Sequence, residues 1–118
     1  MNRQAAERFG AWGERRAGWW LRLHGWRILA RRVKVRSGEI DLIARRGRTT
    51  AFIEVKTRRT VAELGNAIDA YRLRRVAAAT NAVAHHYVRP GDDIRIDVIL
   101  IAPRHWPKHL VNVWFDQK

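Results

Sequence analysis

The stretch Gly-Glu-Ile-Asp-Leu-Ile-Ala at residues 38–44, followed by Phe-Ile-Glu-Val-Lys-Thr-Arg at residues 52–58, decides the fold of this chain. Both stretches are rich in β-branched and other apolar residues interrupted by single charges, a composition typical of β-strands. Gly47-Arg48 between them is a Gly-X pair suited to a two-residue type II′ turn. The sequence therefore predicts a β-hairpin centred on Gly47 and Arg48.

The register of this hairpin brings two acids together. With the turn centred there, Asp41 lies directly opposite Glu54, and opposed residues share one face of a sheet. Side chains alternate along a strand, so Lys56 and Glu39 share that face as well. The opposite face is then expected to carry the apolar residues Ile40, Leu42, Ile53 and Val55. A slip of one residue would move the two acids to opposite faces.

Paired carboxylates repel each other, and a fold tolerates such a pair when a positive charge lies between them. Lys56 supplies part of that charge. A divalent cation such as Mg²⁺ would supply more, because it takes oxygen ligands from one or two carboxylates together with waters and phosphate. The alternative is a surface salt bridge among Asp41, Glu54 and Lys56, an arrangement that adds little stability. The hairpin alone leaves both interpretations open.

The rest of the chain is predicted to place helices and strands around this hairpin. A helical pattern over residues 4–24 ends at Gly25, and a second helix over residues 67–87 is expected to follow Asn66 as N-cap, with Asp69 completing a cap-like pair. The expected strands cover residues 26–35, 39–45, 50–57, 93–101 and 110–115. This order, α-β-β-β-α-β-β, favours a single α/β domain over residues 1–118, with a mixed central sheet flanked by helices.

The charge of the chain points to a polyanionic partner. Lys and Arg number 24 against 11 Asp and Glu, which gives a formal net charge of +13. Such an excess favours nucleic acid, because neutralised phosphates release condensed counterions. A solvated basic surface and attraction to anionic lipid are the alternatives. The chain has no cysteine and no apolar run of the ~20 residues that span a bilayer, so we expect a cytoplasmic protein with no membrane partner.

The first helix contains an acid of interest, Glu14. At 100° per residue, Glu14 lies on a stripe of small residues that includes Gly10, Ala17 and Gly18, where a helix can approach a sheet closely. An acid on a buried stripe needs a partner. Alternatively, Phe9, Trp12, Trp19 and Leu23 mark the buried face and leave Glu14 in water. The helical pattern alone does not choose between them.

The histidines and tryptophans carry weaker signals. Pro107 lies between His105 and His109, which argues against a helix that presents both to a metal, and we interpret all five histidines as structural. Six tryptophans suggest base stacking, but Trp19, Trp20 and Trp26 are expected to belong to the core. Trp12, Trp106 and Trp114 are left without an assignment.

Together, these residues resemble a known family. The two hairpin stretches, the run Gly-Ala-Trp-Gly-Glu at residues 10–14, the helix start at residues 67–75 and Arg-Ile-Asp-Val-Ile at residues 95–99 resemble the YraN-like group of small bacterial proteins. That group is described as endonucleases of the PD-(D/E)XK superfamily, similar to archaeal Holliday-junction resolvases. The resemblance covers residues 9–101 and implies a restriction-endonuclease-like core.

The resemblance also implies a role for each matching residue. Asp41 would be the central metal ligand, Glu54 the second acidic ligand, and the backbone carbonyl of Val55 a third. Lys56 would orient or deprotonate the attacking water and balance charge on phosphorus. Glu14 would hold a second ion or a metal-bound water. Glu39 is a weaker candidate that would act through water.

A second set of residues is expected to contact nucleic acid. Arg58 and Arg59 flank the motif and suit phosphate contact. Arg72 stands where we expect lysine in the family, and because a guanidinium stays charged and cannot act as an acid or a base, a phosphate clamp is its only reasonable role. Arg75 lies on the same helical stripe, although a basic helix surface explains both equally well. Tyr71 is a weaker candidate for stacking or phosphate contact.

The predicted function is a Mg²⁺-dependent endonuclease that hydrolyses phosphodiester bonds in branched DNA, with Mn²⁺ as a substitute ion. The alternative is a catalytically silent nuclease fold that binds DNA or RNA as a scaffold in repair or recombination. Resolvases of this kind work as dimers, since two cuts need two sites, so the resemblance makes a homodimer possible, although the sequence shows no readable dimer surface.

Overall fold

The computed structural model describes residues 2–114, and its centre is the predicted hairpin. Strands β2 (Gly38–Arg46) and β3 (Thr49–Thr57) pair antiparallel, with Leu42 opposite Ile53 and Arg46 opposite Thr49. Gly47 has a φ of +59°, the left-handed value that the first position of a type II′ turn requires. The predicted turn and register are confirmed.

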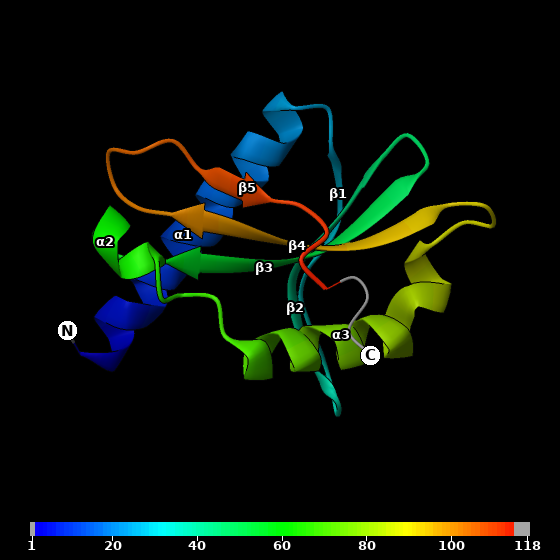
Figure 1. Cartoon of the computed structure of the whole chain (residues 1–118), viewed down its shortest axis with the longest axis horizontal. Helices are drawn as coiled ribbons and strands as arrows, with labels where there is room; N and C mark the ends of the chain where they lie inside the picture. The colour runs from blue at the N-terminus through cyan, green and yellow to red at the C-terminus, as the bar shows by residue number, and fades with distance from the viewer. Residues whose placement is uncertain (1, 115–118) are drawn as a thin grey trace.

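Within residues 2–114, five strands form one mixed sheet in the order β1-β2-β3-β4-β5. β1 (Arg27–Val35) is antiparallel to β2, β4 (Asp93–Ile101) is parallel to β3, and β5 (Lys108–Leu110) is antiparallel to β4. A parallel connection needs a crossover, and the chain between β3 and β4 supplies one that contains a long helix (Figure 1). This is the α/β architecture with a mixed central sheet predicted from the sequence, and its element order agrees with a restriction-endonuclease-like core.

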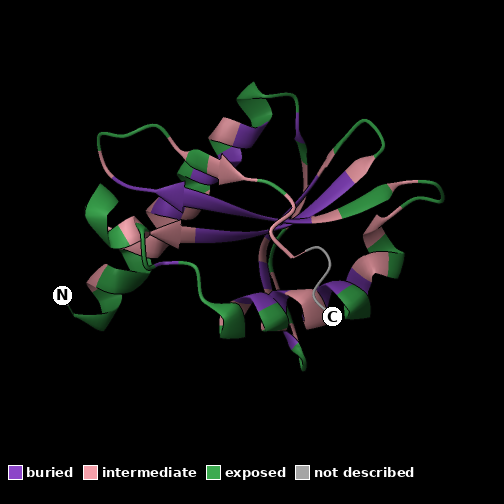
Figure 2. Cartoon of the chain, viewed as in Figure 1, coloured by how far each residue is buried: buried purple, intermediate pink, exposed green. Residues whose placement is uncertain are grey.

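Helices cover both faces of the sheet. α1 (Arg3–Leu23) packs on one face over a cluster that includes Leu42, Ile53 and Ile99, and α3 (Ala70–Tyr87) packs on the other over Ile43 and Phe52. The central strands are accordingly buried on both sides, while the helices keep exposed outer faces (Figure 2). Because both faces of the hairpin are covered, a charged residue within it, Glu54, is buried.

The close approach of α1 to the sheet depends on its small residues. Gly13, Ala17, Gly18 and Leu21 are its buried positions. A Cβ atom at Gly13 would overlap the hydroxyl of Thr57 at the end of β3. The small-residue stripe is therefore the buried face, and the alternative assignment is wrong: Trp19 is 62% exposed and Leu23 77% exposed.

The start of the second long helix differs from the prediction. α3 begins at Ala70, and Asp69 rather than Asn66 is its N-cap, because the Asp69 carboxylate accepts a hydrogen bond from the Tyr71 N–H. Residues 65–69 instead follow a short helix, α2 (Val61–Leu64). The buried Ala67 joins the core beneath α3, which draws this segment inward before the helix starts.

Two strand predictions also need correction. The last strand covers Lys108–Leu110 and not residues 110–115, because Asn112 has a left-handed φ of +55° and donates its N–H to Asp97 instead of a neighbouring strand. Phe115, the predicted end of that strand, lies outside the described residues. Ile40 was expected to share a face with Leu42, but it packs in the cluster under α3.

The tryptophans divide between core and surface. Trp26 is buried, as predicted, and Trp20 packs against the cluster under α1 with part of its surface exposed. Trp19, expected in the core, is on the surface. No helix within residues 2–114 has the length and apolar character needed to cross a membrane.

Candidate functional site

The candidate site lies where β2 and β3 stop pairing. Their antiparallel ladder runs from Arg46 and Thr49 to Leu42 and Ile53, and the two acids occupy the next position on each strand. There the Asp41 Oδ2 atom accepts a hydrogen bond of 2.8 Å from the Val55 main-chain N–H. The Val55 N–H is therefore paired with a side-chain carboxylate instead of a main-chain carbonyl of β2. This hydrogen bond holds the Asp41 side chain at the open end of the hairpin.

Glu54 is buried among cations. Its side chain is 2% exposed, and its Oε2 atom lies 3.1 Å from Arg72 Nε and 3.3 Å from Lys56 Nζ. A second guanidinium nitrogen of Arg72 donates to Oε1 at 3.4 Å. Burial of an acid this deep requires such compensation. The alternative of a solvated surface salt bridge is therefore wrong for this residue.

The two acids behave as one coupled pair. Burial raises the pKa of Asp41 above its ordinary value, and the hydrogen bond and negative charge of Glu54 add to that rise. Burial also opposes ionisation of Glu54, but hydrogen bonds from Asp41 and Arg72 and the charge of Lys56 outweigh it, so the pKa of Glu54 is lowered. The pair is best described as sharing one proton, with Glu54 as the ionised member.

Glu14 reaches the same region from α1. Its carboxylate binds Arg32 of β1 at 2.9 Å, and its negative charge contributes to the raised pKa of Asp41. Glu14 and Asp41 line one cleft of about 530 Å³ together with Glu39, Lys34 and Arg72. Glu14 from α1 and Asp41 from the hairpin therefore line the same cleft.

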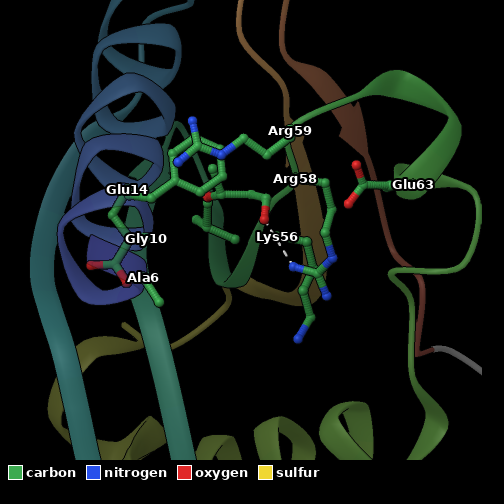
Figure 3. A pocket seen from close by; sticks show the side chains of 10 residues that line it. Ala6, Gly10, Glu14, Lys56, Arg58, Arg59 and Glu63 are labelled. Atoms are coloured by element: carbon green, nitrogen blue, oxygen red, sulfur yellow. Dashed lines mark hydrogen bonds between the residues drawn. The ribbon is translucent and has the colours of Figure 1, made fainter. Parts of the chain in front are cut away.

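A second cleft adjoins the first at Gly10 and Glu14, which line both. It has a volume of about 350 Å³ and is bounded by α1, the end of β3 and α2. Figure 3 shows Lys56, Arg58 and Arg59 coming from the strand end, with Glu63 facing them from α2. Lys56, the predicted catalytic lysine, therefore lines a cleft together with Arg58 and Arg59, which we call the basic cleft. Its volume is sufficient for a phosphate group and the attached sugar.

The remaining predicted residues divide into two groups. Arg72 joins the site and bridges its acids, because it also donates to Glu39 at 2.8 Å. Glu39 therefore contacts the acid pair through a guanidinium, whereas its predicted action through water stays a prediction. The main-chain carbonyl of Arg75 lies at the start of β2, where it would overlap a Cβ atom at Gly38, and the proposed contact of Arg75 with nucleic acid stays a prediction. Tyr71 is exposed on the first turn of α3.

The described residues fit a hard divalent cation, but they offer it only two converging carboxylates, those of Asp41 and Glu54. Within residues 2–114, no three acidic or histidine side chains converge closely enough to hold an ion together. Asp41 and Glu54 do converge, and the raised pKa of Asp41 means that the pair retains a proton when no cation lies between its members. Two carboxylates with waters and phosphate are a sufficient ligand set for Mg²⁺.

Arg32 is a site residue that the sequence did not predict. It holds Glu14 from a left-handed backbone conformation, φ +50°, which is unfavourable for a residue with a side chain. In the sequence it is one arginine of the basic run at residues 31–32, so no pattern distinguishes it. Only the packing of β1 beside α1 reveals its partner.

The fold and this site define an α/β protein whose acids and cations meet at the open end of a central hairpin. The chain belongs to the family described as uncharacterised protein family UPF0102, whose model matches residues 13–101. It is 64% identical over 114 residues to a UPF0102 protein of Sphingopyxis alaskensis, which covers 97% of this chain and 98% of that relative. It is also 62% identical to a UPF0102 protein of Rhizorhabdus wittichii, over 99% of this chain and 100% of that relative.

Proposed function

We propose that this protein is a Mg²⁺-dependent endonuclease of the PD-(D/E)XK kind that hydrolyses phosphodiester bonds in branched DNA. One observation carries the proposal. The buried Glu54 contacts both Asp41 and Lys56, and two adjoining clefts reach this group: Asp41 and Glu14 line one, while Glu14 and Lys56 line the other beside Arg58 and Arg59. Acids that bind a metal, a lysine next to them and arginines for the phosphates are the parts that phosphodiester hydrolysis needs.

Each residue has a distinct task in this proposal. Asp41 and Glu54 would hold the ion, with the Val55 carbonyl as a further oxygen ligand and Glu14 as a ligand for a second ion or for water. The ion would polarise the phosphate and favour deprotonation of water. Lys56 would orient the water whose oxygen forms the new bond to phosphorus as the bond to the leaving sugar oxygen breaks. Arg58 and Arg59 would hold the neighbouring phosphates.

Cleavage of a four-way junction and a flap by the purified protein, in Mg²⁺ or Mn²⁺, tests the proposal. Asp41→Asn and Lys56→Ala are expected to reduce the rate by at least about 100-fold, as for the loss of a metal ligand or a general acid–base group. Asp93→Asn is the matched control: Asp93 is exposed and lies opposite Thr49, at the other end of the sheet. Cleavage that survives in Asp41→Asn protein would defeat the proposal.

A second function is favoured by the cations that already surround Glu54. Arg72 and Lys56 neutralise its charge without any ion, which suits a silent nuclease fold that binds DNA or RNA as a scaffold. Calorimetric titration with Mn²⁺ separates the two. Heat of binding that disappears in Asp41→Asn protein supports the enzyme, and salt-sensitive nucleic-acid affinity without metal binding supports the scaffold. The expected cytoplasmic location and homodimer stay predictions.

A further inference from the structure

A series of aromatic rings and arginines runs along one face of α1, starting at the basic cleft. Phe9 and Arg59 both line that cleft, and the guanidinium carbon of Arg59 lies 4.3 Å from the centre of the Phe9 ring. Phe9 stacks on Trp12 with ring centres 5.6 Å apart and planes 7° from parallel. Arg16 lies 5.0 Å from the centre of the Trp12 ring.

The series continues onto the loop between β4 and β5. Arg16 lines a further cleft of about 530 Å³ with Arg104, His105 and Trp106. The centre of the Trp106 ring is 6.4 Å from that of Trp20, one turn beyond Arg16 on α1. We call these residues the α1 track: Phe9, Trp12, Arg16, Trp20, Arg59, Arg104 and Trp106.

The spacing of the helical members makes the track continuous. Phe9, Trp12, Arg16 and Trp20 follow one another at intervals of three or four residues, which places them on one side of a helix. At about 1.5 Å per residue they extend over roughly 16 Å. The track therefore connects the candidate site to a distant patch of surface, which is the reach of a few nucleotides rather than of one small molecule.

Core packing explains only part of this track. Trp12 and Trp20 pack against the cluster under α1, so their presence needs no ligand. Trp106 is different, because it is 84% exposed in a loop, next to the exposed Arg104 and His105. An exposed tryptophan beside arginines has the composition of sites that bind single-stranded nucleic acid, where bases stack on rings and cations follow the phosphates.

We propose that the α1 track binds an unpaired nucleic-acid strand, with a base stacked on Trp106 and phosphates held by Arg104, Arg16 and Arg59. The Phe9 and Trp12 rings already have guanidinium groups over them, so Trp106 is the stacking platform and those arginines are the phosphate contacts. That the bound strand leads toward the cleft at Lys56 rests on the proposed function. In that case the preferred substrate of the enzyme has a single-stranded arm.

The test measures binding without metal, so that it does not depend on cleavage. Fluorescence anisotropy in EDTA would compare labelled twelve-nucleotide oligo(dT), the matching oligo(rU) and a duplex of the same length. Trp106→Ala is expected to weaken single-strand affinity about tenfold, as for the loss of one stacked base, and to leave duplex affinity within about twofold. Trp106→Phe keeps a ring and should restore most of the affinity.

The arginines have their own readout. Replacing Arg16 and Arg104 with Gln is expected to flatten the dependence of single-strand affinity on salt, by a slope of about 0.7 for each phosphate that an arginine no longer neutralises. Arg48→Gln is the control, because Arg48 is equally exposed but lies in the turn of the β2–β3 hairpin. Equal flattening in the control would overturn the assignment of these arginines.

Two further outcomes would overturn the proposal. If the Trp106→Ala protein binds the single strand as tightly as the natural protein does, Trp106 is not a stacking platform. Sedimentation showing that Trp106→Ala converts a dimer to a monomer would make this patch a contact between copies of the chain. Failure to cleave any DNA would defeat the proposed enzyme but leave the single-strand measurement, and this proposal, intact.

Discussion

At the scale of single residues, Arg72 determines the state of the candidate metal site. Its guanidinium pairs with both Glu54 and Glu39, so an ion that binds Glu54 must compete with it. The predicted phosphate clamp and the observed ion pairs are compatible if Arg72 turns from the acids to a phosphate when an ion arrives. From the first turn of α3, the guanidinium of Arg72 reaches both Glu39 and Glu54.

Arg72→Gln is expected to lower the free energy of unfolding by about 1–3 kcal/mol in EDTA, because Glu54 loses one of its two cations. With that competitor removed, the rise in Tm on adding millimolar Mg²⁺ should exceed the rise of the natural protein. Thermal unfolding with and without Mg²⁺ measures both effects. Arg74→Gln, on the exposed side of the same helix, is the control. An unchanged response to Mg²⁺ would contradict this account.

Asp97 is a second buried acid, and it does not belong to the candidate metal site formed by Asp41 and Glu54. It accepts hydrogen bonds from Arg95, His109 and the Asn112 N–H, and its side chain is fully buried. Burial alone would raise its pKa, but these three donors outweigh burial, so the pKa of Asp97 is lowered. The acid thereby attaches β5 and the segment that follows it to β4.

Asp97→Asn is expected to cost about 3 kcal/mol of unfolding free energy at pH 7, as for a buried ion pair that loses one partner. Because the folded pKa lies below the unfolded value of about 3.9, the stabilisation is complete above that value and disappears as the pH falls through the folded pKa. Urea unfolding at pH 7 and pH 3 should therefore show the difference between the two proteins narrowing in acid. A constant difference would contradict the role of the ionised carboxylate.

At the scale of elements, the position of α1 decides whether Glu14 reaches the site. The helix approaches β3 closely only because residue 13, next to Glu14, has no side chain to meet Thr57. The contact between Gly13 on α1 and Thr57 on β3 therefore lies next to both Glu14 and Lys56.

Gly13→Ala is expected to destabilise the protein by about 1–3 kcal/mol, since the added methyl group must push α1 from the sheet. Gly10→Ala on the same helix is the matched control, because nothing lies within 4 Å of the atom it would add. That change should stabilise the helix by about 0.5–1 kcal/mol. Chemical denaturation of both variants measures the contrast, and similar effects of the two would refute the close approach.

At the scale of the whole molecule, the net charge of +13 would set the strength and salt dependence of the proposed nucleic-acid binding. Arg58→Gln with Arg59→Gln is expected to reduce the slope of log affinity against log salt for duplex DNA by about 2, near 0.9 for each phosphate contact. Titrations over roughly 50 to 200 mM salt measure the slope. Arg48→Gln, a single change in the hairpin turn, should alter it by less than half as much.

Much of the fold could be predicted because its elements carry local signals. Gly47-Arg48 set the hairpin register, and the apolar periodicity set the order of helices and strands. Predictions failed where two residues offered similar local signals, as with Asn66 and Asp69 as helix caps, or where a distant group ended an element, as Asp97 ends β5 by binding Asn112.

The sequence by itself determined that Asp41 and Glu54 stand opposite each other with Lys56 beside them, because strand register depends on the turn and on alternation along the chain. Only the tertiary structure decided what surrounds them. Glu54 is buried, Arg72 reaches it from α3, and Arg32 holds Glu14. These contacts join residues distant in the chain, and a lone arginine in a basic sequence has no local pattern that reveals which acid it will meet.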